Sequence, residues 1–315
     1  MYELIIIGGG PAGSAAAVYA ARKKIKTAII AYEFGGQSNV SDDIQNWIGT
    51  PHISGADLAK NLETHVREYA GDIVAILKGK KVIGITKNDE QIGSLFKINL
   101  DSGETLESKA LLITTGSNHR KLEAKNANTF EHKGLTYCAS CDGPFFTGMP
   151  VAVIGGGNAA FESALQLSAY CQKVYILNRS EKFRADEITL ETIRKNPKIE
   201  IINNAVVVEV LGDESNTFVG GLIYKNVLGN EEIKLDVKGI FVEIGQLPNT
   251  DIIGDLITKD AHNKIIIDHK NMKTSRSGIW AAGDCTDVLY HQNNIAAGHA
   301  VLALEDIYQW LQTKK

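Results

Sequence analysis

The chain has few cysteines, no long apolar run and little excess charge, and each shortage excludes a class of protein. Four cysteines in 315 residues are too few for a disulfide-stapled scaffold. No apolar run approaches the ~20 residues that a membrane helix needs. A net charge of -4 gives no electrostatic attraction to nucleic acid or to an acidic membrane. The first residues, MYELIIIGGGPAG, lack the basic region and the cleavage site of a signal peptide, so we expect a soluble, cytoplasmic protein.

What the chain does have is length and an internal repeat. A chain of 315 residues is long enough for two domains. The stretch at 3–31, ELIIIGGGPAGSAAAVYAARKKIKTAIIA, is echoed at 151–177 by VAVIGGGNAAFESALQLSAYCQKVYIL. Superposing Gly8 on Gly155 also places Ala16 on Ser163. Each copy has the order strand, tight turn, helix, strand, so the fold class is α/β with two Rossmann-like, three-layer nucleotide-binding domains.

Each copy is followed by alternating apolar and polar residues that predict a small antiparallel β-meander. The turns of these meanders are DSG at 101–103 and LGN at 228–230. After the second meander, residues 247–315 supply a strand and a helix that the first domain otherwise lacks. We therefore expect one nucleotide-binding domain formed by residues 1–116 and 247–315. Residues 117–246 form a second nucleotide-binding domain that is inserted into it.

The first glycine motif predicts a dinucleotide site. Gly8, Gly10 and Gly13 follow a strand and open a helix, so they allow a tight turn and a close approach to a pyrophosphate. The phosphates then lie on the helix N-terminus. The acid that holds the ribose hydroxyls is expected about 20 residues on, where Glu33 stands. We expect Glu33 to lie beyond the strand, so a plain surface acid is the alternative.

The second glycine motif predicts a second dinucleotide site, with Gly155, Gly157 and Ala160 in the G-x-G-x-x-A pattern. No acid closes the strand that follows. Ser180 takes the position of Glu33, beside Arg179 and close to Arg184. Arginines suit a 2′-phosphate, so we favour NADPH over NADH; solvated surface charges are the alternative.

The remaining motif is TYCASCDGP, with Cys138, Cys141 and Asp142. A zinc site usually needs two such cysteine pairs, and the chain has one. A structural disulfide across so small a loop adds little stability and is disfavoured in a reducing cytosol. A redox dithiol remains. A buried carboxyl with a raised pKa moves protons, so Asp142 is either its proton donor or a turn and cap residue.

With the motifs assembled, the chain resembles the low-molecular-weight thioredoxin reductases and, even more, the reductase portion of the flavoprotein subunit of alkyl hydroperoxide reductase. The stretches that carry the resemblance are GGGPAG, FGGQ, TTG, YCASCDGPFF, VIGGGNAAFESA, FVEIGQLPNT and AAGDCTD. It implies FAD in the first domain, NADPH in the second and a homodimer. Beyond the glycine motifs, the resemblance implies a place along FAD for seven more residues: Gly36, Gln37 and Asn46 in the ribityl and flavin region, Thr115 and Gly116 near the adenine side, Asp284 at the ribityl–phosphate arm and Gln292 at the pyrimidine end of the flavin.

The resemblance also implies a division of labour in the dithiol. Cys141 faces the flavin, Cys138 attacks the disulfide of thioredoxin or a thioredoxin-like protein, and Asp142 moves the proton. No thioredoxin-like segment precedes Met1, so we expect a separate protein as the acceptor. Where the NADPH-using reductases read His-Arg-Arg, this chain has Asn178 and Ser180 in the first and third positions, which weakens the expectation of NADPH.

Three alternatives stay open. The chain is the reductase arm of a peroxide-detoxifying system that uses NADH, a flavin-bound redox sensor, or a reductase that receives electrons from ferredoxin. The sequence does not decide the role of Cys285, which follows Gly-Asp in AAGDCTD.

Overall fold

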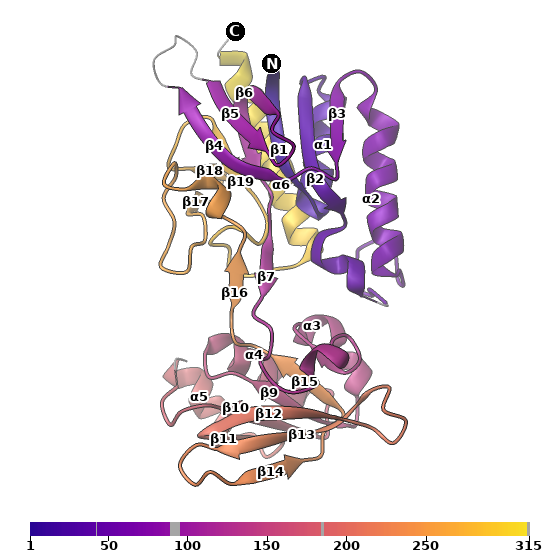
Figure 1. Ribbon diagram of the computed structural model, residues 1–315, viewed down its shortest axis with the longest axis vertical. Coiled ribbons are helices and arrows are strands. Elements are labelled where there is room, and N and C mark those ends of the chain that lie inside the picture. The colour runs from indigo at the N-terminus through magenta and orange to yellow at the C-terminus, as the bar shows by residue number, and fades with distance from the viewer. Residues whose placement is uncertain (42, 89–94, 184–185, 314–315) are drawn as a thin grey trace. The chain divides into compact units, whose positions relative to one another are not determined.

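The computed structural model describes residues 1–41, 43–88, 95–183 and 186–313. The chain divides into two compact units (Figure 1). Unit 1 comprises Met1–Asn118 and Leu247–Lys315, and unit 2 comprises His119–Gln246. The assignment of FAD to one unit and of NAD(P)H to the other stays a prediction.

Unit 1 is built on a parallel sheet whose central strand is a continuous apolar run. Leu4, Ile5 and Ile6 are fully buried, as expected for a strand covered on both faces. The strands, in spatial order, are β19 (Ile279–Ala281), β6 (Thr105–Ile113), β1 (Tyr2–Gly9), β2 (Thr27–Phe34) and β3 (Val74–Lys78). Two short antiparallel strands, β18 (Lys273–Thr274) and β17 (Ile267–Asp268), extend the β19 edge.

Helices and a meander complete unit 1. Helix α1 (Pro11–Arg22) packs against α2 (Gly55–Ala70) and α6 (Asn293–Thr313), and its fully buried Ala16, Ala17 and Ala20 permit a close approach. Strands β4 (Val82–Asn88) and β5 (Leu95–Leu100) form the predicted meander with β6, and Gly103 adopts φ +85° in its DSG turn. Two 3₁₀ turns, η1 (Gly36–Val40) and η4 (Asp251–Ile253), lie in the connections.

Unit 2 repeats this plan on a smaller scale. Its parallel sheet has the order β11 (Ile199–Asn203), β10 (Lys173–Asn178), β9 (Pro150–Ile154), β15 (Gly239–Val242), β8 (Leu135–Thr136). The helical elements are α3 (Ala139–Asp142), α4 (Asn158–Ser168), α5 (Glu187–Arg194), η2 (Ala127–Thr129) and η3 (Gly143–Phe146). The second meander is β12 (Ala205–Gly212), β13 (Val219–Asn226) and β14 (Glu232–Leu235).

The connections between the units run as a pair. Strand β7 (Ser117–His119) pairs with β16 (Gln246–Pro248) in a two-stranded ribbon. The chain thus leaves unit 1 after β6, builds unit 2, and returns to add β19 and α6. The predicted α/β fold with an inserted second domain is confirmed.

Both sheets reverse their strand order at a defined place. In unit 1 the chain steps outward from β1 to β2 and β3, then returns to β6 on the other side of β1. In unit 2 it steps from β9 to β10 and β11, then returns to β15 beside β9. Ligands of such sheets bind outside the carboxyl ends of the strands at this switch point. The expected crevices therefore lie at the ends of β1 and β6, and of β9 and β15.

Candidate functional site

The first glycine turn lies at the switch point of unit 1. Gly8 adopts φ +121°, and a Cβ added there would lie 2.7 Å from the carbonyl carbon of Thr114. A Cβ on Gly13 would lie 2.9 Å from the Thr114 hydroxyl oxygen. Gly10 is the N-cap of α1, and no side chain caps the helix there. The turn therefore presents helix N–H groups to an anion, as a pyrophosphate site requires.

A second loop approaches this turn. Gly36 adopts φ +61°, and its added Cβ would lie 3.5 Å from the Cα of Gly10. The predicted ribose acid Glu33 lies inside β2 and is exposed, so its expected place beyond the strand was wrong. The parallel pairing of β1 with β2 continues to Phe34, so the strand includes Glu33. Gln37 donates from Nε2 to the hydroxyl of Ser117 over 3.4 Å.

The residues predicted for the flavin's far end are brought together from distant parts of the sequence. Asn46 donates from Nδ2 to Oε1 of Gln292 over 2.9 Å. Asn294 donates to the carbonyl of Asn46 over 2.7 Å, and Ser38 donates to Asn293 over 3.0 Å. The loop at 36–46 is thus joined to the N-terminus of α6 by amide and hydroxyl groups, which suit the polar edge of a flavin.

The remaining predicted flavin residues follow β6 and β19. Gly116 adopts φ +65°, and Asn249 donates to the carbonyl of Thr115 over 3.0 Å. Burial raises the pKa of Asp284, while the charges of Lys264 and His299 oppose that rise. The segments that follow β6 and β19 therefore also carry polar groups. These residues fit FAD.

Cys285 is fully buried directly after Asp284. Its Sγ lies 3.6 Å from the carbonyl oxygens of Ile113 and Ala282, and burial raises the pKa of its thiol to about 11. Cys285 is therefore a packed, protonated thiol.

The second glycine turn has the same construction. Gly155 adopts φ +154°, and its added Cβ would lie 2.9 Å from the Cβ of Ala160. Gly157 is the N-cap of α4, again without a side-chain cap. Ala160 is fully buried against the sheet. The donor set fits a second pyrophosphate, as the predicted pyridine nucleotide site requires.

The loop after β10 carries the residues predicted to distinguish NADPH from NADH. Arg179 and Ser180 are exposed, and Arg184 lies outside the described residues. Asn178 is buried and donates from Nδ2 to the carbonyl of Ser180 over 2.6 Å. Asn178 therefore shapes the loop from inside, a role that the sequence did not indicate.

The dithiol lies on α3, between β8 and β9. Cys138 and Cys141 form a disulfide with a Cα–Cα distance of 5.3 Å. Cys138 is half-buried at the N-cap of α3, and its Sγ accepts the backbone N–H of Cys141 over 3.1 Å. Cys141 is exposed. The short helix thus holds both sulfurs in one turn, with Cys141 the more exposed of the two. The assignment of Cys138 to the partner and of Cys141 to the flavin stays a prediction.

Asp142 is held by a residue that sequence reasoning missed. The buried hydroxyl of Thr136, at the end of β8, donates to Oδ2 of Asp142 and accepts the backbone N–H of Cys138 over 3.5 Å. Burial raises the pKa of Asp142, and the Thr136 hydrogen bond and the charge of His132 oppose the rise. The side chain does not cap η3. The raised pKa is what a proton donor beside a thiolate needs.

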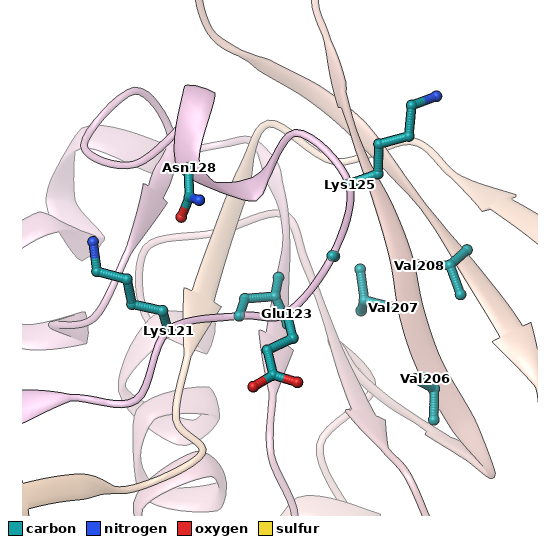
Figure 2. A pocket seen from close by; sticks show the side chains of 9 residues that line it. Lys121, Glu123, Lys125, Asn128, Val206, Val207 and Val208 are labelled. Atoms are coloured by element: carbon teal, nitrogen blue, oxygen red, sulfur yellow. The ribbon is translucent and has the colours of Figure 1, made fainter.

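A surface pocket of about 620 Å³ in unit 2 is separate from these groups (Figure 2). It lies between the segment 121–128 and β12, with Val206, Val207 and Val208 on the strand side. Lys121 and Lys125, on its other side, pair with Glu131 and Glu209 at 2.8 and 2.9 Å. None of the predicted site residues lines it, so the candidate chemistry remains with the dithiol and the glycine turns.

The described part of the chain contains no helix that is both long and apolar enough to cross a membrane.

Comparisons with known proteins agree with this geometry. The pattern of the family described as "Pyridine nucleotide-disulphide oxidoreductase" matches residues 2–300. A solved structure, "Thioredoxin reductase from Giardia duodenalis", superposes with a TM-score of 0.91 at 31% identity and covers 99% of both chains.

Two curated relatives are longer proteins. A subunit of the alkyl hydroperoxide reductase of Xanthomonas campestris pv. phaseoli is 39% identical over 297 residues, which are 94% of this chain and 54% of that protein. The "NADH dehydrogenase" of Bacillus subtilis (strain 168) is 36% identical over 310 residues, 98% of this chain and 58% of that protein. The chain thus spans little more than half the length of these relatives. It belongs to the pyridine nucleotide-disulphide oxidoreductase family, an enzyme family whose membership implies a flavin and a pyridine nucleotide.

Proposed function

We propose that this chain is an FAD-containing reductase that takes electrons from NADPH and passes them through Cys138–Cys141 to a disulfide of thioredoxin or a thioredoxin-like protein. One observation carries the proposal. The disulfide lies in the same unit as the second glycine turn, and a carboxyl with a raised pKa follows it directly.

The residues of each unit have distinct binding roles in this proposal. FAD lies on the α1 turn, with Asn46 and Gln292 at its flavin end and Asp284 at its ribityl–phosphate arm. The pyridine nucleotide lies on the α4 turn, with Arg179 at its adenosine end. A flavin and a nicotinamide bound there supply two-electron reduction of the disulfide.

The dithiol then reduces the partner by thiol–disulfide exchange. The Cys138 thiolate attacks one sulfur of the partner's disulfide, forms a mixed disulfide and releases one partner thiolate. The Cys141 thiolate next attacks the Cys138 sulfur, restores the disulfide and releases the second partner thiolate. Asp142 protonates one leaving thiolate, and solvent protonates the other.

The surface beside the dithiol supports a protein as the acceptor. Phe145 is 48% exposed four residues after Cys141, whereas Phe146 packs edge-on against Phe241 at 5.4 Å. An exposed aromatic side chain next to a reactive disulfide is an anchor for a protein partner. A homodimer remains an expectation from the resemblance.

A second candidate is the reductase arm of a peroxide-detoxifying system that uses NADH. Two observations favour it: the 39% identity to a subunit of an alkyl hydroperoxide reductase, and the loop after β10, where Asn178 and Ser180 depart from the NADPH pattern. In that case the acceptor is a thioredoxin-like domain or protein that serves a peroxidase.

Anaerobic titration tests the donor and the acceptor in turn. The purified flavoprotein is titrated with NADPH and then, separately, with NADH, and flavin bleaching is followed. Oxidised thioredoxin or an oxidised thioredoxin-like carrier of a peroxidase is added next. We expect reoxidation by a carrier in the native chain and none in Cys138→Ser or Cys141→Ser. A flavin that neither nucleotide bleaches rejects the proposed donors, and reoxidation that survives both substitutions rejects the dithiol pathway.

A further inference from the structure

A carboxyl group at the switch point of unit 2 has no assigned role. Glu243 directly follows β15, and its backbone N–H donates to the carbonyl of Ile154 over 2.8 Å. A Cβ on Gly155 would overlap its carbonyl oxygen, so Glu243 lies against the start of the glycine turn. Its Oε1 accepts the hydroxyl of Ser163, on α4, over 2.7 Å.

The internal repeat shows that this carboxyl is particular to unit 2. In unit 1 the N–H of Thr114 donates to the carbonyl of Ile7 over 2.9 Å. A Cβ added to Gly8 would overlap the carbonyl oxygen of Thr114, just as one added to Gly155 would overlap that of Glu243. Thr114 is therefore the equivalent of Glu243, but its hydroxyl bonds the Ile7 carbonyl over 2.9 Å. Ser163 has Ala16 as its equivalent. Unit 2 thus carries both a carboxyl and a hydroxyl that holds it, where unit 1 carries neither.

The topology indicates which half of the nucleotide Glu243 meets. A dinucleotide crosses the switch point with its pyrophosphate on the helix N-terminus, here that of α4. The adenosine half lies toward the first half of the sheet, over β9 and β10, where Arg179 and Ser180 stand. The other half lies over β15, which ends next to Glu243. This step rests on the proposed use of a pyridine nucleotide.

We infer that Glu243 is a specificity-determining residue that binds the carboxamide of the nicotinamide, with Ser163 holding the carboxyl in place. A carboxamide offers an N–H donor and a carbonyl acceptor side by side. A protonated carboxyl offers the complementary O–H donor and carbonyl acceptor, so the two groups form a pair of hydrogen bonds. A carboxylate retains only the acceptor half of this pair.

The environment of Glu243 favours the protonated form near neutral pH. Burial raises the pKa of Glu243 to about 7, and the charge of Glu162, also on α4, acts in the same direction. The Ser163 hydrogen bond opposes them because it stabilises the carboxylate. Below about pH 7 the carboxyl therefore donates, and above it the donor is lost. Nucleotide binding through this pair takes up a proton and weakens as the pH rises.

Calorimetric binding of oxidised dinucleotides tests the inference without turnover. The ligands are NADP⁺ or NAD⁺ and the matching 3-acetylpyridine analogues, which lack the amide N–H donor. We expect the native flavoprotein to prefer the nicotinamide ligand by about three- to tenfold at pH 6, the effect of one ordinary hydrogen bond. Above pH 7 the affinity falls, and the measured heat depends on the ionisation enthalpy of the buffer because a proton is taken up.

Three variants and one control separate the proposed contact of Glu243 with the carboxamide from a general effect on protein stability. Glu243→Ala is expected to abolish both the preference and the pH dependence, whereas Glu243→Gln keeps the preference and loses the pH dependence because an amide does not titrate here. Ser163→Ala removes a hydrogen bond that favours the carboxylate, so the fall in affinity moves to higher pH. Glu200→Gln, on β11 at the far edge of the same sheet, is the matched control and leaves both properties unchanged.

The outcomes are distinguishable from those of the proposed function. A Glu243→Ala protein that keeps both the native preference and its pH dependence overturns the inference, even if NAD(P)H bleaches the flavin. A native protein that binds and oxidises neither nucleotide overturns the proposed function itself.

Discussion

Two carboxyl groups of unit 2, Asp142 and Glu243, are each partly buried, and each accepts a hydrogen bond from one hydroxyl group. Burial raises both pKa values because it penalises the charged form. The hydroxyls of Thr136 and Ser163 act in the opposite direction because they donate to the carboxylate. In each pair the hydroxyl therefore modifies the proton affinity of the carboxyl. Asp142 lies beside the disulfide, and Glu243 lies beside the second glycine turn.

Removing the Thr136 hydroxyl is expected to raise the pKa of Asp142 further. In Thr136→Val the carboxylate loses its donor, so Asp142 stays protonated to higher pH and the alkaline limb of the proposed disulfide exchange moves upward. Thr136→Ser keeps the donor and the native profile. Asp142→Asn removes the limb and slows the exchange about 100-fold, the lower end for a general acid. An alkaline limb that is unchanged in Thr136→Val would show that Thr136 has only a packing role.

Gly8→Ala is expected to release the flavin. The residue adopts φ +121°, and its new Cβ would overlap the Thr114 carbonyl, so strain of about 1–3 kcal/mol falls on the turn that is predicted to hold the phosphates. Gly84→Ala, on β4, is the control because its added Cβ meets nothing within 4 Å. The measurement is the flavin-to-protein ratio after purification. Full flavin content in Gly8→Ala would contradict a phosphate site at this turn.

The roles of residues could be predicted where a sequence motif constrains the backbone. They were missed where the role depends on the direction in which a side chain points. The glycines of the two motifs could be predicted because a tight turn requires them. In the structure both turns lie at the switch points of the sheets. Nothing in the sequence shows that Asn178 turns inward to Ser180, or that Thr136 reaches Asp142, because both depend on how a strand end faces the next loop. The role of Glu243 had one usable signal, its equivalence to Thr114 in the repeat.

At the scale of elements, a partly buried polar contact joins α6 to β19, the strand that precedes it. Trp280, on β19, is 1% exposed, and its indole N–H donates to Asp306 of α6 over 2.9 Å. Trp310 of the same helix packs edge-on against Trp280 at 5.5 Å. The last helix is thereby held in one register against the sheet of unit 1.

Asp306→Ala is expected to destabilise unit 1 by about 1–3 kcal/mol, since it leaves a buried indole N–H without its acceptor. Asp306→Asn retains an acceptor oxygen for the indole and loses the partly exposed ion pair to Lys273, whose Nζ lies 3.0 Å from Oδ2 of Asp306. Urea unfolding followed by tryptophan fluorescence compares the two. Equal midpoints for Asp306→Ala and the native chain would show that the indole finds another partner.

The longer elements could be read from the sequence because their periodicity is strong. The buried run of β1, the alanine-rich α1 and the two meanders all lie where the pattern indicated. The short strands β7 and β16 were not predicted as strands. Three residues carry too little periodicity to be read, and their pairing depends on contacts between segments more than 120 residues apart.

At the scale of the whole molecule, unit 2 is an insertion at one place in unit 1. The amide of Asn118 donates to Asn249 over 3.0 Å, and the N–H of Asn249 donates to Gly116 over 3.0 Å. The segments where the chain leaves unit 1 and returns to it are therefore held side by side by hydrogen bonds within unit 1. The predicted boundary, between 116 and 117, lies two residues before the observed division at Asn118.

Excision of His119–Gln246 should therefore leave a folded flavoprotein. Joining Asn118 to Leu247 through a short Gly-Ser turn closes a gap that is already narrow, so the entropy cost of the join is small. The large core of unit 1, with β1, β6 and α6, stays complete.

We expect the excised chain to retain flavin and to lose nucleotide-driven bleaching, because the second glycine turn and the dithiol are gone. Purified protein gives both readouts, and its controls are the native chain and the Cys138→Ser form, which should still bleach. An excised chain that folds without flavin would place part of the flavin site in unit 2, and one that NADPH still bleaches would place the nucleotide site in unit 1.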